Sequence, residues 1–465
     1  MAPETSGRPA TEVRRPAPVS LPTALTIAGS DSGGGAGIQA DLRTMAAHDT
    51  FPTSVVTSVT AQHTRGVDRS TVLDEADVRA QYEAVVDDFD VGAAKTGMLG
   101  TAEIVRTVSD CLATADFPVV VDPVMVATSG DRLLSRAGER AYEDLLSAAT
   151  VVTPNRREAA VLVGDETDAG PSARSAGERL VELGAHAALV TDGHGAEDTV
   201  CDVLVTTEGV HEFEHPRIDT EATHGTGCSL SAAVAANLST GLGVEAAVAG
   251  AIDFVARAVR YPLDVGQGAG AVHPLAGRRN RASERETVAS VRDLVRRFVD
   301  ADVSPLVPEV GMNVAGATPY AESTDEVAAV EGRLTRTMGG VEPTAGVRFG
   351  ASSHLARFLL AARDHEPSLR FATNCRLSSA TREGLASLDA PVEWFDRTAE
   401  PEDASTMDWA ADRVFGRPGE SPRAVADEGA VGKEPMIRVV GATPDEVAGI
   451  VGHLRGVAAR GTPTS

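Results

Sequence analysis

The chain has 465 residues, 42% of them hydrophobic, and a formal net charge of −25 at neutral pH. This length exceeds one ordinary core, so two or three domains are expected. The acidic balance argues against a nucleic-acid binder, which needs a basic face, and no apolar run is long enough to span a membrane.

The cysteines and the N-terminal residues bear on the cellular compartment. Four cysteines are scattered along the chain and form neither a metal-binding knuckle nor a disulfide framework. Residues 1–20 are rich in Pro, Ser, Thr and Arg without an apolar stretch, which is typical of a loose tail and not of a signal peptide. We therefore expect a cytoplasmic protein.

Nearly all basic residues are arginine, because Lys95 and Lys433 are the only two lysines in the sequence. An acidic, lysine-poor surface is typical of a halophilic protein, in which many carboxylates keep the surface hydrated. The two lysines that remain are predicted to lie where a compact ammonium group is required.

The first predicted strand, residues 24–28, runs into the glycine-rich loop 29–37 and then into a helix that begins at Ile38. This arrangement lets α/β proteins bring their backbone close to a ligand. The glycine spacing fits neither the P-loop nor the dinucleotide fingerprint. Asp41, in the first turns of the helix, could face a ligand or simply favour the helix start.

Strand and helix patterns then alternate, and polar residues follow the strands. The strand signals lie within residues 54–59, 93–99, 117–125, 151–158 and 188–194. Repeated units of this kind predict an α/β fold with a mostly parallel sheet flanked by helices. A binding site is expected along the carboxyl edge of that sheet.

Residues 223–230 combine Gly225 and Gly227 with the start of a long helix of small residues. The glycines permit a tight turn that gathers several N–H groups, and the helix N-terminus adds its positive end. Together they predict an anion hole for a phosphate in transfer. Cys228, at the helix start, is expected to be acidified. The plainer alternative is a tight turn before a packed helix.

Several unrelated motifs occur together and in order. They are residues 29–42, 95–99, 122–125 with 129–134, 153–155 with Glu158, and 225–229. This set closely resembles the hydroxymethylpyrimidine/phosphomethylpyrimidine kinases of thiamine biosynthesis, members of the ribokinase-like superfamily. The resemblance covers residues 21–275 and implies a ribokinase-like domain. Such a domain uses ATP to phosphorylate the pyrimidine alcohol and then its monophosphate.

The resemblance also implies roles for single residues. Gln62 and Asp41 would hold the aminopyrimidine, whose donor and acceptor edges suit an amide and a carboxylate. Mg²⁺ prefers oxygen ligands. The turn 225–228 would hold the transferred phosphoryl group. Orientation and anion stabilisation would then contribute more than proton abstraction by a thiol. The candidates are Gly29, Asp41, Gln62 and Met98 for the pyrimidine; Asn155, Thr226 and Asp192 for ATP and its phosphates; Glu158 for Mg²⁺; and Lys95, Gly225, Gly227 and Cys228 for catalysis.

One position departs from the family pattern. Thr191 stands where these kinases usually carry a lysine that contacts the nucleotide phosphates. That cationic contact is therefore expected to be missing or to be supplied by an arginine.

Residues 276–286 are polar and charge-dense, as expected of a linker. Residues 287–299 have apolar positions at helical spacing, which predicts an amphipathic helix at the start of a second domain. This smaller domain, 287–465, is expected to be α/β or α+β. Within it, residues 323–330 are predicted to form a short capped helix.

A serine pair, His354 and Arg357 stand together at a predicted helix start, which again suggests an anion site. For any single arginine in this half, a surface salt bridge is the plainer interpretation. Residues 349–357 and 432–438 are the most specific part of a resemblance to the archaeal-type thiamine-phosphate synthase domain. That resemblance implies coupling of hydroxymethylpyrimidine diphosphate to hydroxyethylthiazole phosphate. Arg333 and His354 match positions needed for the synthase, and the further candidates for substrate binding are Arg348, Asn374 and Lys433.

Two alternatives stay open at this point. A pyridoxal-type kinase is disfavoured by Gln62 and the motif 225–229. A C-terminal sensor of thiamine phosphate is disfavoured because there is no helix-turn-helix pattern and both Arg333 and His354 are present. A sensor that tunes the kinase stays an alternative. The expected partners are the small-molecule substrates, ATP and Mg²⁺, with neither nucleic acid nor membrane. A homo-oligomer, most simply a dimer, is expected.

Overall fold

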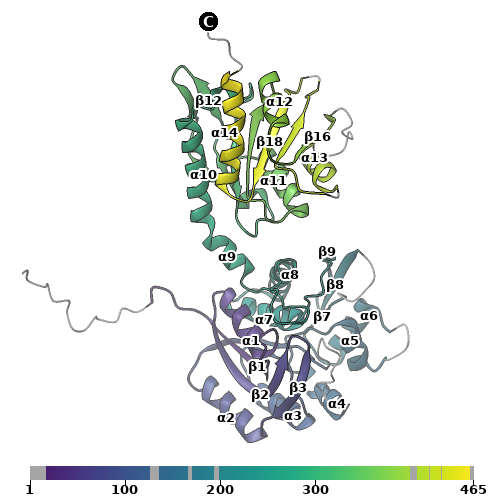
Figure 1. The fold of residues 1–465 in the computed structure, drawn as a ribbon. Helices are drawn as coiled ribbons and strands as arrows, with labels where there is room; N and C mark the ends of the chain where they lie inside the picture. The colour runs from purple at the N-terminus through teal and green to yellow at the C-terminus, as the bar shows by residue number, and fades with distance from the viewer. Residues whose placement is uncertain are drawn as a thin grey trace, which may run out of the picture. The chain divides into compact units, whose positions relative to one another are not determined.

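The computed structural model describes residues 17–125, 136–165, 170–192, 198–397, 406–417, 419–430 and 432–460. The chain divides between Ala276 and Gly277 into an N-terminal unit and a C-terminal unit, each built on its own sheet (Figure 1). Of the predicted tail, 1–20, the described residues 17–20 are exposed and form no helix or strand. Within the described ranges, no helix has the length and apolar character needed to cross a membrane.

The N-terminal unit contains a nine-stranded sheet in the order β3-β2-β1-β4-β5-β6-β7-β8-β9. All pairs from β2 to β7 are parallel, and antiparallel pairs add β3 at one edge and β8 and β9 at the other. The predicted mostly parallel sheet is therefore confirmed. Its strands are β1 (Thr23–Ser30), β2 (Phe51–His63), β3 (Gly66–Val72), β4 (Val91–Thr96), β5 (Val119–Val121), β6 (Val151–Val152), β7 (Ala187–Val190), β8 (Thr199–Thr206) and β9 (Val210–Pro216).

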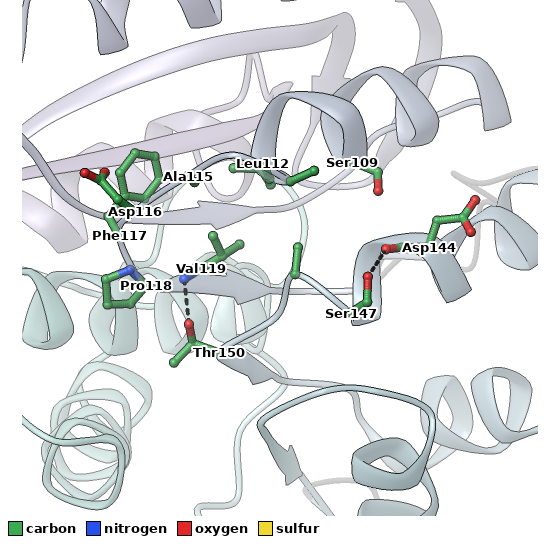
Figure 2. A pocket seen from close by; sticks show the side chains of 12 residues that line it. Ser109, Leu112, Ala115, Asp116, Phe117, Pro118, Val119, Asp144, Ser147 and Thr150 are labelled. Atoms are coloured by element: carbon green, nitrogen blue, oxygen red, sulfur yellow. Dashed lines mark hydrogen bonds between the residues drawn. The ribbon is translucent and has the colours of Figure 1, made fainter.

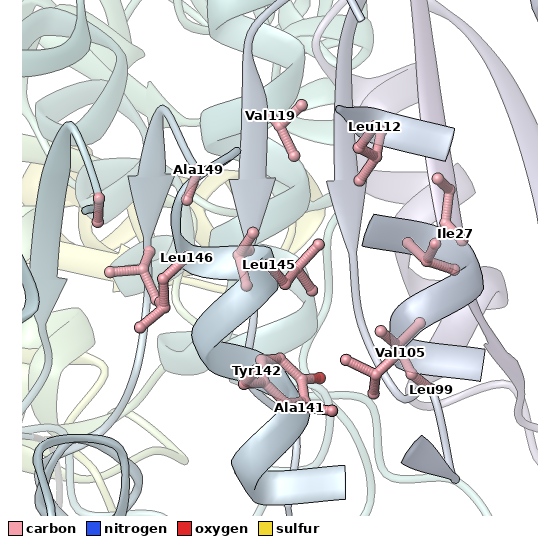
Figure 3. Close-up of a cluster of buried hydrophobic side chains, with 14 of the residues drawn as sticks. Ile27, Leu99, Val105, Leu112, Val119, Ala141, Tyr142, Leu145, Leu146 and Ala149 are labelled. Carbon is pink, nitrogen blue, oxygen red and sulfur yellow. The ribbon is translucent and has the colours of Figure 1, made fainter. Parts of the chain in front are cut away.

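Both faces of this sheet are covered by helices, which is why its central strands are nearly continuous apolar runs. One face packs against α2 to α6, where Ile27, Leu145 and Leu146 belong to one buried cluster (Figure 3). The other face packs against α1, α7 and α8, and the small buried residues of α7 allow a close approach to the sheet. The helices are α1 (Gly37–Ala47), α2 (Glu75–Val86), α3 (Ala102–Leu112), α4 (Arg136–Leu146), α5 (Arg156–Val163), α6 (Ala173–Glu182), α7 (Thr226–Ser239) and α8 (Val244–Arg260).

The C-terminal unit contains a seven-stranded sheet in the order β14-β11-β10-β15-β18-β17-β16 and a small hairpin, β12-β13. Its pairs are antiparallel except for β16 with β17, so the unit is of the α+β class. Helices α10, α12 and α14 cover one face, and α11 and α13 cover the other. The elements are α9 (Ala276–Ala282), α10 (Glu284–Asp300), β10 (Val314–Ala317), β11 (Val327–Val330), β12 (Leu334–Thr337), β13 (Gly340–Pro343), β14 (Val347–Phe349), α11 (His354–His365), β15 (Phe371–Arg376), α12 (Ser379–Ala386), β16 (Val392–Trp394), α13 (Thr406–Phe415), β17 (Ala424–Asp427), β18 (Met436–Gly441) and α14 (Pro444–Arg460), with 3₁₀ turns at Ser304–Leu306 and Thr324–Glu326.

Two segments of the junction and the second half differ from the prediction. The expected linker, 276–286, forms α9 and the first turn of α10. Asn280 in α9 is 2% exposed and donates to Glu326 Oε1 at 2.6 Å, so this segment packs into the C-terminal unit. The expected capped helix, 323–330, is a 3₁₀ turn followed by β11, whose four residues are fully buried between two strands. A short apolar run of this kind does not distinguish a strand from a helix.

Candidate active sites of the two units

The glycine-rich loop after β1 is folded around Asp31, which is 2% exposed. Its carboxylate accepts hydrogen bonds from the N–H groups of Gly33 and Ala36, each at 2.8 Å, and lies 3.1 Å from His224 Nε2. Burial alone would raise the pKa of Asp31, but the hydrogen bonds with His224, Ala36 and Gly33 lower it below its usual range. Asp31 was not among the residues predicted from the sequence. The signal that could have identified it is an acidic residue inside a glycine-rich loop.

The turn before α7 requires glycine at position 225. Gly225 has a φ of +87°, and a Cβ at this position would overlap the Gly35 carbonyl oxygen. The first turn of α7 contains the N–H groups of Gly227 and Cys228, which have no helical carbonyl one turn back to bind. The glycine-rich loop and the 223–230 stretch therefore lie together at one helix N-terminus, as an anion hole requires.

A buried charge cluster is centred on Lys95, whose side chain is fully buried. Its Nζ lies 3.0 Å from both carboxylate oxygens of Asp41 and 3.8 Å from Asp122 Oδ2. Thr26 donates to Asp41 at 2.7 Å, and Ser231 of α7 donates to Asp122 at 2.9 Å. Burial alone would lower the pKa of Lys95, but the carboxylates raise it, so the ammonium stays charged.

This arrangement bears on the predicted role of Asp41. Its side chain is fully buried, and both oxygens are engaged by Lys95 and Thr26. In this geometry Asp41 positions Lys95, and its direct contact with a pyrimidine stays a prediction. The placement of Lys95 between two carboxylates fits the expectation that this lysine was kept for its compact ammonium group.

The thiol of Cys228 is not acidified. Its pKa is raised to about 12, mainly by burial, with Lys95 opposing and the carboxylates of Asp41 and Asp122 adding to the increase. The prediction from the helix start is therefore wrong. The sequence shows the helix N-terminus, but it does not show that α1 and the end of β5 bring two carboxylates to the same place.

The candidates for the pyrimidine lie at the same edge of the sheet. Gly29 N–H donates to the Met98 carbonyl at 3.1 Å, and any side chain at position 29 would overlap Met98 and Ser58. Gln62 is joined to the glycine-rich loop because its N–H donates to Ser32 Oγ at 2.8 Å, while the Ser32 hydroxyl donates to the Gln62 carbonyl at 2.7 Å. The structure thus brings Gly29, Met98 and Gln62 to the loop that follows β1.

Asn155 and Glu158 form a capping box at the start of α5. The Asn155 side chain accepts from the Glu158 N–H at 3.0 Å, and Glu158 Oε2 accepts from the Asn155 N–H at 3.1 Å. Glu158 Oε1 makes a long contact of 3.5 Å with the Met125 N–H. Burial and the nearby Asp122 raise the pKa of Glu158 to about 8. A partly engaged carboxylate beside another acid suits a hard divalent cation, although no group of three metal-ligating side chains occurs among the described residues.

Thr191, where a lysine was expected, forms a parallel bridge with Asn155 at the end of the sheet. The Arg156 N–H donates to the Thr191 carbonyl at 3.1 Å, and the Arg156 guanidinium pairs with Asp192 at 3.3 Å. An arginine therefore lies beside the position of the missing lysine. The neighbouring residues 193–197 and the motif 129–134 lie outside the described part of the chain.

Asp192 is supported by a pH-sensitive pair. Its N–H donates to Asp202 Oδ1 at 3.1 Å, and Asp202 Oδ2 lies 3.3 Å from His215 Nε2. The hydrogen bond with Asp202 raises the pKa of His215 above its ordinary value. Protonated His215 therefore contributes stability that is fully present below the unfolded pKa and is lost as the pH rises through the raised pKa.

We expect His215→Gln to lower the free energy of unfolding of the N-terminal unit by about 1 kcal/mol at most in mildly acidic buffer. The difference should vanish in alkaline buffer, because the imidazole is then neutral in the wild type. Urea unfolding of both proteins across this pH range measures it. A difference that did not change with pH would show that the His215 charge has no part in stability.

In the C-terminal unit, the predicted pair Arg333 and His354 lies among further cations. His354 is the first residue of α11, and burial followed by the charges of Arg357, Arg333 and Arg438 lowers its pKa. Gly311 has a φ of +84°, and a Cβ there would lie 2.7 Å from Arg333 Cβ. A neutral histidine within a cationic surrounding fits an anionic ligand.

The other candidates in this unit have structural partners. Arg348 forms an exposed ion pair with Glu331 at 2.9 Å. This is the surface salt bridge that is the plainer interpretation of a single arginine in this half. Asn374 accepts from the Asn313 N–H at 2.7 Å and donates to the Gly311 carbonyl at 3.1 Å, so it holds the segment 311–313, against which Arg333 packs at Gly311. Lys433 is exposed in a turn whose backbone pairs with Ala430.

A polar hollow in the N-terminal unit, whose lining Figure 2 shows, includes none of these residues. Its lining includes Phe117 and Pro118 before β5, Asp144 and Ser147 at the end of α4, and Thr150 before β6. It therefore lies at the amino ends of the strands, opposite the edge that contains the predicted site residues. We do not consider it a candidate active site.

Comparisons with known proteins agree with this division. The family model for phosphomethylpyrimidine kinase matches residues 31–273, and that for the thiamine-phosphate synthase ThiN matches residues 290–452. A hydroxymethylpyrimidine/phosphomethylpyrimidine kinase of Streptomyces coelicolor is 48% identical over 256 residues, which cover 55% of this chain and 95% of the relative.

A longer relative spans both units. The bifunctional thiamine biosynthesis protein ThiDN of Methanocaldococcus jannaschii is 29% identical over 427 residues, 91% of this chain and 96% of the relative. Among solved structures, the ADP complex of Bacillus subtilis pyridoxal kinase matches with a TM-score of 0.52 and 34% identity. That match covers 56% of this chain and 99% of the other.

Proposed function

Because the chain belongs to the phosphomethylpyrimidine kinase family and carries a thiamine-phosphate synthase ThiN domain, we propose that it is a bifunctional enzyme of thiamine biosynthesis. The N-terminal unit phosphorylates hydroxymethylpyrimidine and then its monophosphate with ATP. The C-terminal unit couples the resulting diphosphate to hydroxyethylthiazole phosphate. The observation that carries this proposal is the relative ThiDN, whose similarity extends over both units in the same order.

In the kinase, the glycine-rich loop and the Gly225 turn support a phosphoryl-transfer site. The N–H groups of Gly227 and Cys228 would stabilise the charge that develops on the transferred phosphoryl group. Lys95 adds a fixed positive charge because Asp41 and Asp122 hold it ionised. Catalysis then depends on orientation and electrostatics more than on a side-chain base.

We expect Gly225→Ala to lower the kinase rate by about 10²-fold or more, because displacing an oriented group by about 1 Å has that effect. The new Cβ would overlap the Gly35 carbonyl oxygen and would strain a backbone with positive φ. Gly241→Ala is the control, since Gly241 also has positive φ, +87°, but faces open space. Kinase turnover under saturating ATP measures both, and equal losses in the two variants would contradict the steric argument.

Cys228 is expected to act as a neutral thiol. With its pKa raised to about 12, it supplies no thiolate near neutral pH. Cys228→Ala should therefore change the kinase rate by less than about 10²-fold, the lower end of general-base catalysis. The pH–rate profile of the variant should have the same shape as that of the wild type. A kinase rate that rose with pH in the wild type but not in Cys228→Ala would contradict this expectation.

We propose that Mg²⁺ binds with Glu158 and Asp122 at the nucleotide phosphates. The fit rests on the raised pKa of Glu158 and on the weak engagement of its Oε1. When bound, the cation would neutralise phosphate charge. Arg156, beside Thr191, is our candidate for the cationic contact of the missing lysine.

In the synthase, the C–O bond between the pyrimidine methylene and the diphosphate breaks, and the bonding electron pair leaves on the diphosphate oxygen. The thiazole nitrogen then forms the new C–N bond. The enzyme must stabilise the departing anion, which suits the cations around His354.

The test is a coupled assay that gives the purified chain hydroxymethylpyrimidine, hydroxyethylthiazole phosphate, ATP and Mg²⁺. Thiamine phosphate is the expected product. Accumulation of the pyrimidine diphosphate without coupling at any salt concentration would overturn the synthase proposal in favour of a sensor. The same assay with pyridoxal tests the alternative kinase, for which the comparisons provide a structural neighbour.

The salt requirement, cytoplasmic location and oligomeric state stay predictions. The net charge of −25 supports an expectation of higher stability at high salt, because screening reduces the repulsion among carboxylates. Thermal unfolding at increasing KCl measures this effect. Sedimentation of the full chain tests the expected dimer.

A further inference from the structure

The C-terminal unit contains a buried cluster with an excess of positive charge. Asp427, at the end of β17, has a fully buried side chain, and the side chains of Arg397 and Arg438 are 8% and 6% exposed. Arg438 Nη1 donates to Asp427 Oδ2 at 2.9 Å, and Arg397 Nη1 lies 3.4 Å from Asp427 Oδ1. Two guanidinium groups thus share one carboxylate.

The excess charge is not neutralised elsewhere among the described residues. Arg397 Nε is buried without a hydrogen-bond partner. Arg438 lies against the rings of Phe358 and Phe395, 5.5 and 5.7 Å from their centroids, which attract a cation but carry no charge. A buried charge is costly unless it is balanced, so the extra positive charge of two guanidinium groups on one carboxylate is most simply explained by an anion that completes the cluster.

The cluster adjoins the candidate synthase site. Phe358, which contacts Arg438, lies four residues after His354 on α11, and residues at this spacing share one face of a helix. The charge of Arg438 also contributes to the lowered pKa of His354. In addition, Asp427 Oδ1 accepts the Gly429 N–H at 2.9 Å and so anchors the turn that leads to Lys433.

We propose that Arg397 and Arg438, held by Asp427, form the subsite that receives the diphosphate group. The subsite is suited to phosphate oxyanions in general. Of the two phosphorylated substrates we assign it the diphosphate, which carries the larger charge and leaves as an anion. This assignment rests on the proposed synthase function. Arg397 binds the anion directly, whereas Asp427 is a positioning residue.

The test compares Arg397→Gln with the wild-type full chain. In the variant, Asp427 still accepts hydrogen bonds from Arg438 and from the Gly429 N–H, so folding should be preserved. The kinase activity of the variant reports on the rest of the chain. Inhibition of coupling by inorganic diphosphate should weaken at least tenfold, and the KM for the pyrimidine diphosphate should rise similarly. Arg397→Lys should recover part of the loss.

Arg417→Gln is the matched control, because Arg417 forms an exposed ion pair with Glu393 in the same unit. It should leave all these constants unchanged. Unchanged diphosphate inhibition in Arg397→Gln would overturn the proposal. So would an effect confined to inorganic phosphate and the KM for the thiazole phosphate, which would assign the subsite to that substrate.

A calorimetric titration separates failure of this inference from failure of the synthase proposal. If the wild type formed no thiamine phosphate, inorganic diphosphate could still be titrated into the wild-type chain and into Arg397→Gln. An Arg397-dependent binding step would support the subsite without the synthase. Identical titrations would overturn it.

Discussion

Replacing Lys95 by methionine is expected to abolish kinase activity and to lower the free energy of unfolding of the N-terminal unit by about 3–5 kcal/mol. Methionine fills a similar volume but leaves Asp41 and Asp122 buried without a counter-ion. Breaking one side of a buried ion pair has this effect because the remaining charge keeps its desolvation cost. Urea unfolding and a phosphorylation assay measure the two losses.

A double variant separates the structural and catalytic parts of this effect. Lys95→Met combined with Asp41→Asn removes one of the two orphaned charges while the Thr26 hydroxyl can still donate to the amide oxygen. It should recover much of the stability but none of the activity. Lys433→Met is the control, because the other lysine of the chain is exposed. Wild-type stability in Lys95→Met would show that the buried ammonium is dispensable.

His354→Ala and Arg333→Ala are each expected to lower thiamine phosphate formation by about 10²–10⁴-fold, the range found for positioned acid–base groups and anion-stabilising donors. The kinase should continue to produce the pyrimidine diphosphate, because both residues belong to the C-terminal unit. His365→Ala is the control on the same helix, since His365 pairs with Asp412 at the other end of α11. Product analysis of one reaction mixture reports both activities.

The pH dependence gives a second measurement. Partial burial and the surrounding arginines hold the pKa of His354 below its ordinary value, so the imidazole should lose its proton at a lower pH than an ordinary histidine. The coupling rate should therefore not fall with a midpoint at the ordinary histidine pKa of about 6.5. If the wild-type coupling rate had such a midpoint and His354→Ala did not, the cations would not act on this histidine.

Local patterns in the sequence were sufficient for much of the N-terminal unit. The strand–helix alternation and the glycines at 29–37 and 225–227 predicted a parallel sheet with its site at the carboxyl edge. These features depend on residues that are close together in the chain. The φ preferences of glycine indicate the turns, and the spacing of apolar residues indicates the strands and helices. In the C-terminal unit the sequence allowed only α/β or α+β. The antiparallel pairing that decides between them joins distant segments such as β10 and β15.

The errors have a common physical origin. Cys228 lies at a helix start, which favours a thiolate, but burial by other elements, together with the carboxylates of Asp41 and Asp122, raises its pKa. Residues 327–330 can be read as helix or strand, and burial between β10 and β14 made them a strand. In both cases a long-range contact outweighed the local preference.

The sequence by itself determined the two families, the order of the two units and the residue types available for phosphate chemistry. Only the tertiary structure decided which charges meet: Lys95 with Asp41 and Asp122, Asp31 with His224, and Arg397 and Arg438 with Asp427. Ionisation depends on burial and on neighbours that lie far away in the chain. Spacing along the sequence cannot contain that information, because folding brings these groups together.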